Sequence, residues 1–158
     1  DWSSDVCSSD LPRRITAEDT GDLLAPFGAA GEAVDVVVFA APQLSLVEMG
    51  QVATLCDGRR RAQGTDLVVC TSAQVYGDAS SMGFVEAIES FGGTVLTGTC
   101  FYQQYAREIA EANGWTRLLS NSAKIVNILG GYGYRPALAS MERCVASAEA
   151  GHIIGEAG

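Results

Sequence analysis

The chain has 158 residues, 47% of them hydrophobic, and its 19 acidic and 10 basic residues give a net charge of −9. This composition is typical of a globular domain with its own core and excludes a disordered chain. An acidic chain without a basic stripe is not expected to bind nucleic acid, and the longest apolar run, residues 36–42, is too short to span a membrane.

The first eleven residues, DWSSDVCSSDL, are expected to be foreign to the protein. They have no hydrophobic periodicity and no signal-peptide core, and they match letter for letter the translation of a widely used sequencing adapter. We therefore take residues 1–11 as a non-native scar, residues 12–33 as a truncated lead-in, and residues 34–158 as a single α/β domain. Without the scar, 16 acidic residues remain and the net charge becomes −6.

From residue 34 on, apolar runs typical of strands alternate with helical patterns. The Val-rich run at 34–42 predicts a strand buried on both faces. A helix follows Ser45, because Glu48 completes a capping-box pattern and Gly58 comes after the last apolar position. Between this helix and the next strand, the basic run Arg59–Arg61 is interpreted as a solvated loop.

The same alternation continues to the end of the chain. Further strands are predicted at 65–72, 93–100 and 115–120, with a short extended piece near 132–135. Further helices are predicted at 73–91 (broken near Gly83), 101–114, 121–131 and 138–151. Strands that alternate with helices of this length indicate βαβ units, so the predicted fold is a three-layer α/β/α domain with a mostly parallel sheet.

Four cysteines lie beyond the scar, and none belongs to a C-x-x-C pair, so a reduced, cytoplasmic setting is expected. Cys56, Cys70 and Cys144 have apolar neighbours and are predicted to be buried structural thiols. Cys100 instead follows a strand and opens a predicted helix, whose N-terminus would stabilise a thiolate. A metal ligand is the better role for it, because the chain's one histidine, His152, lies in the tail and cannot serve as its base.

In a parallel sheet the carboxyl ends of all strands meet at one edge, where ligands bind. The loops that leave those ends are small and rich in hydroxyl groups, and helix amides beside them suit an anion such as a carboxylate. Helix capping is the alternative role for Ser45, Ser72 and either Asn121 or Ser122. Lys124 falls in the first turn of its helix, so either an anion lies nearby or the side chain is simply solvated.

Five blocks resemble the aconitase X family in order and spacing, over about residues 34–151. This resemblance implies an aconitase-like fold and an iron–sulfur-dependent hydro-lyase, and the family's known activities are dehydration of cis-3-hydroxy-L-proline and of mevalonate 5-phosphate. The blocks are DVVVFAAPQLSLVEM, VVCTSAQVY, MGFVEAIESFGGTVLTGTC, LLSNSAKIVNILGG and SMERCVASAEAG.

The resemblance also assigns roles at the sheet edge. Cys100 matches the family's cluster-ligating cysteine, and the stretch from Asn121 to Lys124 matches its active-site NS-x-K motif. With the other edge residues, the expected site has Lys124 and Ser122 as catalytic residues, Ser45, Ser72, Thr99 and Asn121 as substrate-binding residues, and Cys100 as a ligand of the iron–sulfur cluster.

One position departs from the family pattern. Many members have Cys-Pro-His where this chain has Ala41-Pro42-Gln43, so a second ligand is absent here. The departure favours the hydroxyproline branch, but a divergent substrate or a weakened cluster would explain it equally well. The other ligands and a swivelling small domain are expected outside this sequence, and the chain alone is expected to be inactive. A noncatalytic α/β module that binds a small anion is the alternative from another functional class.

Overall fold

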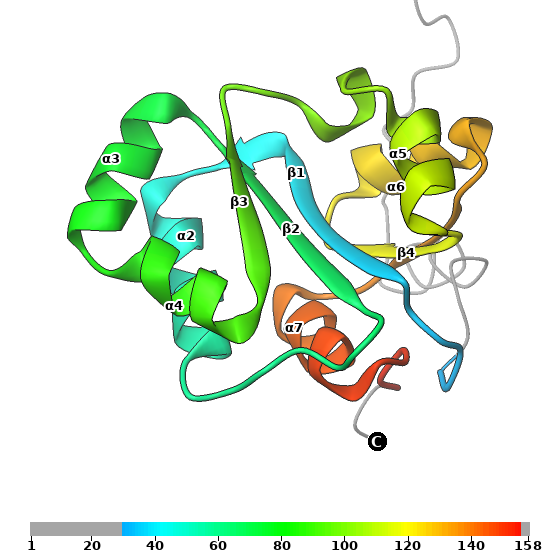
Figure 1. Cartoon of the computed structure of the whole chain (residues 1–158), viewed down its shortest axis with the longest axis horizontal. Coiled ribbons are helices and arrows are strands. Elements are labelled where there is room, and N and C mark those ends of the chain that lie inside the picture. The colour runs from blue at the N-terminus through cyan, green and yellow to red at the C-terminus, as the bar shows by residue number, and fades with distance from the viewer. Residues whose placement is uncertain (1–29, 156–158) are drawn as a thin grey trace, which may run out of the picture.

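The computed structural model describes residues 30–155, so the predictions for residues 1–11 and for most of the lead-in lie outside the described part. Within it, one five-stranded sheet has the order β3-β2-β1-β4-β5, and every neighbouring pair is parallel (Figure 1). The predicted parallel sheet is confirmed. Its strands are β1 (Val36–Leu44), β2 (Asp66–Thr71), β3 (Gly93–Thr97), β4 (Arg117–Ser120) and β5 (Arg135–Leu138).

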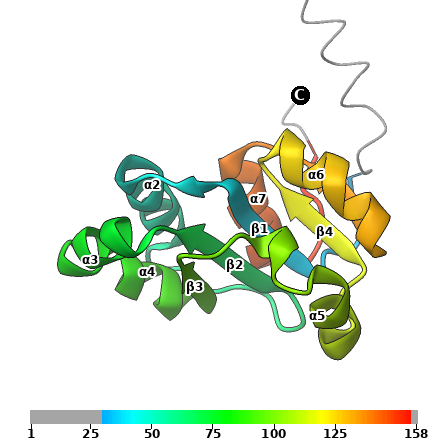
Figure 2. The same ribbon diagram turned by 90° about the horizontal axis from the view of Figure 1, so that it is seen from above.

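Helices cover both faces of this sheet, as predicted for a three-layer domain (Figures 1 and 2). One apolar cluster joins the sheet to α2 (Leu46–Cys56), α3 (Ala73–Ser81), α4 (Phe84–Phe91) and α7 (Met141–Ala150). A second cluster, on the opposite face, joins it to α5 (Ala106–Asn113), α6 (Ala123–Leu129) and the short 3-10 helix η1 (Phe101–Gln103). Another 3-10 helix, η2 (Gly130–Tyr132), follows α6.

Strand β1 lies between β2 and β4 and is buried on both faces. Val37 and Phe39 belong to the first apolar cluster, and Val36 and Val38 to the second, as the Val-rich run predicts. After β1 the chain adds β2 and β3 on one side and β4 and β5 on the other. The gap between the carboxyl ends of β1 and β4 is therefore the topological switch point, where ligands bind in open α/β sheets.

Three predicted elements differ in the structure. The strand predicted at 93–100 ends at Thr97, so Thr99 and Cys100 lie in the loop that follows it. The last strand is Arg135–Leu138, because it pairs along the whole of β4, and α7 therefore begins only after Ser140, whose side chain caps it. The predicted helix 101–114 is split into η1 and α5 by Tyr105, which has a left-handed backbone (φ 55°) and a side chain that is 78% exposed. None of the helices within residues 30–155 is long and apolar enough to cross a membrane.

Candidate functional site

The predicted site residues all follow the carboxyl ends of strands. Ser45 comes directly after β1 and Ser72 directly after β2. Thr99 and Cys100 come two and three residues after β3, and the stretch that contains Asn121, Ser122 and Lys124 comes after β4. Because these strands run parallel, the structure brings all seven residues to one edge of the sheet, on both sides of the switch point.

Hydrogen bonds from serine hydroxyls link β4 to β1 across the switch point. The Ser122 hydroxyl donates to the carbonyl oxygen of Ala41 at 2.7 Å and accepts from the amide of Ile125 at 3.3 Å. Ser120, fully buried, donates to the carbonyl of Val38 at 2.7 Å and accepts from the amide of Ser122 at 3.1 Å. A hydroxyl has one proton and two lone pairs, so Ser122 has one lone pair left for a ligand.

The loop that carries Cys100 is fixed by glutamine side chains. Gln43, at the end of β1, donates from Nε2 to the carbonyl oxygen of Thr99 at 2.8 Å. Gln104 donates to the hydroxyl of Thr99, and the Gly98 amide donates to the carbonyl of Thr71 at 3.0 Å. The sequence places Gln43 at this edge, but it does not predict the contact with Thr99, because the direct neighbours of β1 are β2 and β4, not β3.

Cys100 alone among the four cysteines of the described part is partly exposed. It precedes the three-residue helix η1 rather than the predicted α-helix, so the prediction that Cys100 opens a long helix is wrong. The other three are buried as predicted. Burial raises the pKa of the Cys56 thiol to about 12. For Cys70, burial and then the neighbouring Cys100 thiol raise the pKa to about 11.

Three serines at this edge cap helices, which is the alternative role that the sequence offers for them. Ser45 forms the full capping box with Glu48, whose carboxylate accepts from the Ser45 amide at 2.8 Å and from its hydroxyl at 2.6 Å. Ser72 accepts from the Val75 amide at 3.2 Å. For α6 the cap is Ser122, so Asn121 is not the capping residue and its side chain is exposed.

Lys124 is exposed in the first turn of α6, and its ammonium lies 5.6 Å from the ring centroid of Tyr102. The negative face of an aromatic ring attracts a cation, so Tyr102 gives this lysine a defined neighbour at the edge. The break at Tyr105 separates Tyr102, in η1, from α5, and η1 contacts α6.

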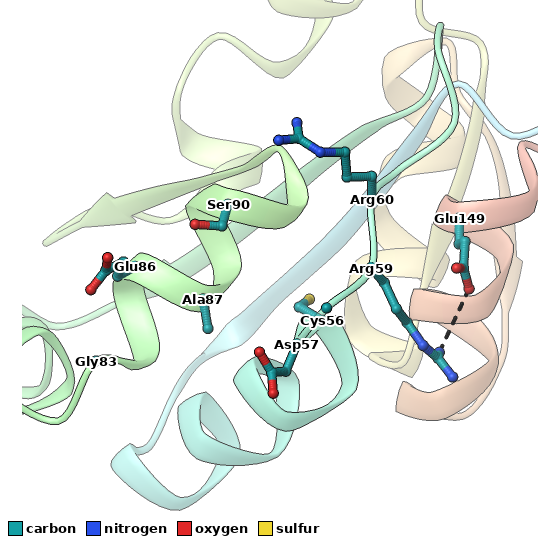
Figure 3. A pocket seen from close by; sticks show the side chains of 10 residues that line it. Cys56, Asp57, Arg59, Arg60, Gly83, Glu86, Ala87, Ser90 and Glu149 are labelled. Carbon is teal, nitrogen blue, oxygen red and sulfur yellow. Dashed lines mark ion pairs between the residues drawn. The ribbon is translucent and has the colours of Figure 1, made fainter.

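A cavity of about 830 Å³ lies elsewhere, at the carboxyl ends of α2 and α7, where Arg59 forms a 3.7 Å ion pair with Glu149 (Figure 3). It contains none of the predicted site residues. The cavity is lined by Cys56, Asp57, Gly58, Arg59, Arg60, Gly83, Glu86, Ala87, Ser90 and Glu149.

The sequence predicts that the basic run Arg59–Arg61 is a solvated loop. Arg59 and Arg60 are exposed, as this prediction requires. Arg61 is not, because its side chain is half-buried and donates to the carbonyls of Gly92 and Thr65.

Comparison with known families identifies the domain. Residues 34–150 match the model of the aconitase X third domain. The chain belongs to the aconitase X family. Its fold agrees: the structure superposes on aconitase X of Thermococcus kodakaraensis with a TM-score of 0.68 at 20% identity, covering 83% of this chain and 33% of that one.

Curated members of the aconitase X family resemble this chain over most of its length. The cis-3-hydroxy-L-proline dehydratase of Pseudomonas aeruginosa is 32% identical over 140 residues, covering 87% of this chain and 24% of that protein. The phosphomevalonate dehydratase large subunit of Methanothermobacter thermautotrophicus is 31% identical over 116 residues, covering 72% and 28%. The chain thus spans about a quarter of the length of these relatives.

The aconitase fold implies an iron–sulfur cluster, and the residues present fit such a group only in part. Within residues 30–155, no three histidine, cysteine or carboxylate side chains are arranged to hold a metal ion. The Cys100 thiol, half-buried at the sheet edge, fits one position in a cluster's ligand shell. Since an iron–sulfur cluster is held by several ligands, the others would have to come from residues beyond those described.

Proposed function

We propose that this chain is the third domain of an aconitase X enzyme that removes water from a small hydroxy acid, most fittingly cis-3-hydroxy-L-proline. The observation that carries the proposal is the match of residues 34–150 to the aconitase X third domain. The 32% identity to a cis-3-hydroxy-L-proline dehydratase and the alanine at position 41 favour this substrate. Mevalonate 5-phosphate is the second candidate, because relatives of nearly equal identity are phosphomevalonate dehydratases.

In this proposal the sheet edge binds the carboxylate end of the substrate. Dehydration takes a proton from the carbon next to the carboxylate and expels hydroxide. Lys124, exposed beside Tyr102, pairs with the carboxylate, and Ser45, Ser72, Thr99 and Asn121 line the edge around it. The remaining lone pair of Ser122 accepts a hydrogen bond from the substrate and so orients its reacting end.

Cys100 is proposed as one ligand of an iron–sulfur cluster, with the others supplied by the rest of the enzyme. When bound, such a cluster would act as a Lewis acid on the leaving oxygen. The swivelling small domain would then cover the substrate at this edge. A small carboxylate rather than a nucleic acid is the proposed partner, and a cytoplasmic location suits the free thiols of the described part.

The proposal is tested with the full-length protein, reconstituted anaerobically with iron and sulfide. We expect the absorption band of a cluster. We also expect cis-3-hydroxy-L-proline to be dehydrated at least about tenfold faster than mevalonate 5-phosphate, a ratio that corresponds to about 1.4 kcal/mol in activation free energy. Cys100→Ser should abolish the band. Cys56→Ala, which removes a buried thiol on the other face of the sheet, should keep it. The 158-residue chain alone should show neither property.

Other outcomes would redirect the proposal. A band that survives Cys100→Ser removes Cys100 from the ligand shell. Faster turnover of mevalonate 5-phosphate exchanges the two substrates. A full-length protein that neither takes up a cluster nor dehydrates either compound, but binds proline-like carboxylates, would instead be a noncatalytic anion-binding module.

A further inference from the structure

Gln43 forms a hydrogen bond across the sheet edge that belongs neither to a helix cap nor to the pairing of two strands. It is the penultimate residue of β1, and its half-buried side chain reaches past the end of β2 to the loop that follows β3. Its Nε2 donates to the carbonyl oxygen of Thr99 at 2.8 Å. This hydrogen bond therefore joins the end of β1 to the loop after β3, although β2 lies between these two strands.

The acceptor of this bond belongs to the peptide group that leads into Cys100. A peptide group is planar, so a hydrogen bond that fixes the carbonyl oxygen of Thr99 also fixes the orientation of the Cys100 amide nitrogen. Cys100 itself makes no side-chain cap for η1, and Gln104, which donates to the Thr99 hydroxyl, belongs to the same loop. Gln43 thus contacts the Thr99–Cys100 peptide from another element, whereas Gln104 contacts Thr99 from within the same loop.

The backbone that carries Gln43 is anchored on both sides. On one side, the Ala41 carbonyl accepts from the Ser122 hydroxyl at 2.7 Å. On the other, the Leu44 carbonyl accepts from the buried Thr71 hydroxyl at 2.7 Å. Because this segment is fixed, the amide of Gln43 is held in place and restrains the Thr99–Cys100 peptide to which it binds.

We propose that Gln43 is a positioning residue, which holds the Thr99–Cys100 peptide so that the Cys100 thiol is presented in one orientation at the switch-point edge. The inference deepens the proposed function, because it says how Cys100, the one partly exposed thiol within residues 30–155, is prepared for the role of a metal ligand. An amide suits the task because it donates a hydrogen bond without placing a charge beside the thiol.

The first test needs no metal. In the metal-free full-length protein, the rate at which iodoacetamide alkylates Cys100 is measured by peptide mass mapping, which separates Cys100 from the other cysteines. Gln43→Leu removes the donor, and loss of one such hydrogen bond should loosen the loop and raise the rate by about three- to tenfold. Gln43→Met keeps a side chain of similar length without a donor or a charge, and should raise the rate likewise.

Two further variants are the controls. Gln43→His keeps an N–H donor at similar reach and should return the alkylation rate to within about twofold of the parent protein. Gln51→Leu makes the same chemical change at an exposed position on α2 and should leave the rate unchanged. Far-UV circular dichroism confirms that each variant is folded. Rates within about twofold of the parent for both Gln43→Leu and Gln43→Met would overturn the proposal.

The second test separates this role from the proposed function. In the reconstituted protein, iron release to a chelator should be about three- to tenfold faster for Gln43→Leu than for Gln51→Leu. If the parent protein takes up no cluster, the proposed function fails, and the alkylation rates still decide whether Gln43 positions Cys100. If the cluster forms but neither rate responds to Gln43, the positioning role is wrong while the proposed function stands.

Discussion

The carboxyl edge of the sheet and the cavity around Arg59 are held together by different interactions. At the carboxyl edge, neutral side chains such as Ser120, Ser122 and Gln43 bond directly to backbone carbonyls of other elements. At the cavity near the opposite ends of the helices, Arg59 and Glu149 form an ion pair whose side chains are 47% and 43% exposed. The walls of the cavity are thus held by an exposed ion pair, whereas the carboxyl edge is held by direct hydrogen bonds to the backbone.

This difference shows which property locates a candidate site. A catalytic or ligand-binding group works only when it is held in place before the ligand arrives, and that depends on the contacts behind it. The cavity around Arg59 offers volume, but it mixes two cations with three carboxylates and so selects no particular ion. The edge beside Ser122 offers contacts that orient specific atoms.

The comparison is tested most strongly at Ser120, which is fully buried and bonded to two backbone groups. Ser120→Ala leaves the Val38 carbonyl and the Ser122 amide without that partner, so it should lower the free energy of unfolding by about 2 kcal/mol. Urea unfolding of the chain measures this loss. Ser90→Ala, at an exposed position in the cavity wall, is the matched control and should cost under about 0.5 kcal/mol. Equal losses would erase the distinction between the two regions.

A smaller effect isolates the link between β4 and β1. Ser122 and Ser72 both cap helices at this edge, but only for Ser122 does the structure show a further bond, to the Ala41 carbonyl. Both alanine variants should therefore lose the contribution of the cap, about 1 kcal/mol. Ser122→Ala should lose about 1 kcal/mol more. Thermal or urea unfolding of the two variants gives the difference, and a difference near zero would show that the Ala41 bond contributes nothing to stability.

The smallest effect is expected in the cavity itself. Arg59→Ala removes an exposed ion pair, and such pairs contribute about 0.5 kcal/mol or less, because water and salt screen them. Unfolding measured at low salt and at about 1 M salt should show even this small loss disappear at the higher concentration. A loss above about 1.5 kcal/mol that persists in high salt would mean that the cavity is as firmly built as the edge.

Much of the fold could be predicted from the sequence, since local signals and burial agree over most of the chain. The run at Val36–Phe39 needs two covered faces, and Ser45 with Glu48 marks the start of α2 wherever that helix packs. The last strand could not be placed, because Leu138 suits a strand or a helix equally and is decided by pairing with Ser120 of β4. That pairing is a long-range contact with no local signal.

The candidate site divides in the same way. Parallel strand order is enough to predict that Ser45, Ser72, Cys100 and Ser122 gather at one edge. The contact from Gln43 to Thr99 could not be predicted, since it depends on how the end of β1 bends over β2. The contact between Lys124 and Tyr102 could not be predicted either. It depends on the break at Tyr105, which comes from the tertiary arrangement, whereas the local pattern favours one continuous helix.

A last consequence follows from the short pairing of residues 31–34 with residues 151–153. The Gly31 amide donates to Ile153, the Ile153 amide to Glu32 and the Val34 amide to Gly151, so both segments lie side by side at the start of β1 (Figure 1). Seven residues of extended strand separate this point from Ala41, roughly 25 Å. The two ends of the described part are therefore joined at the start of β1, at the far end of that strand from the edge that carries Cys100 and Ser122.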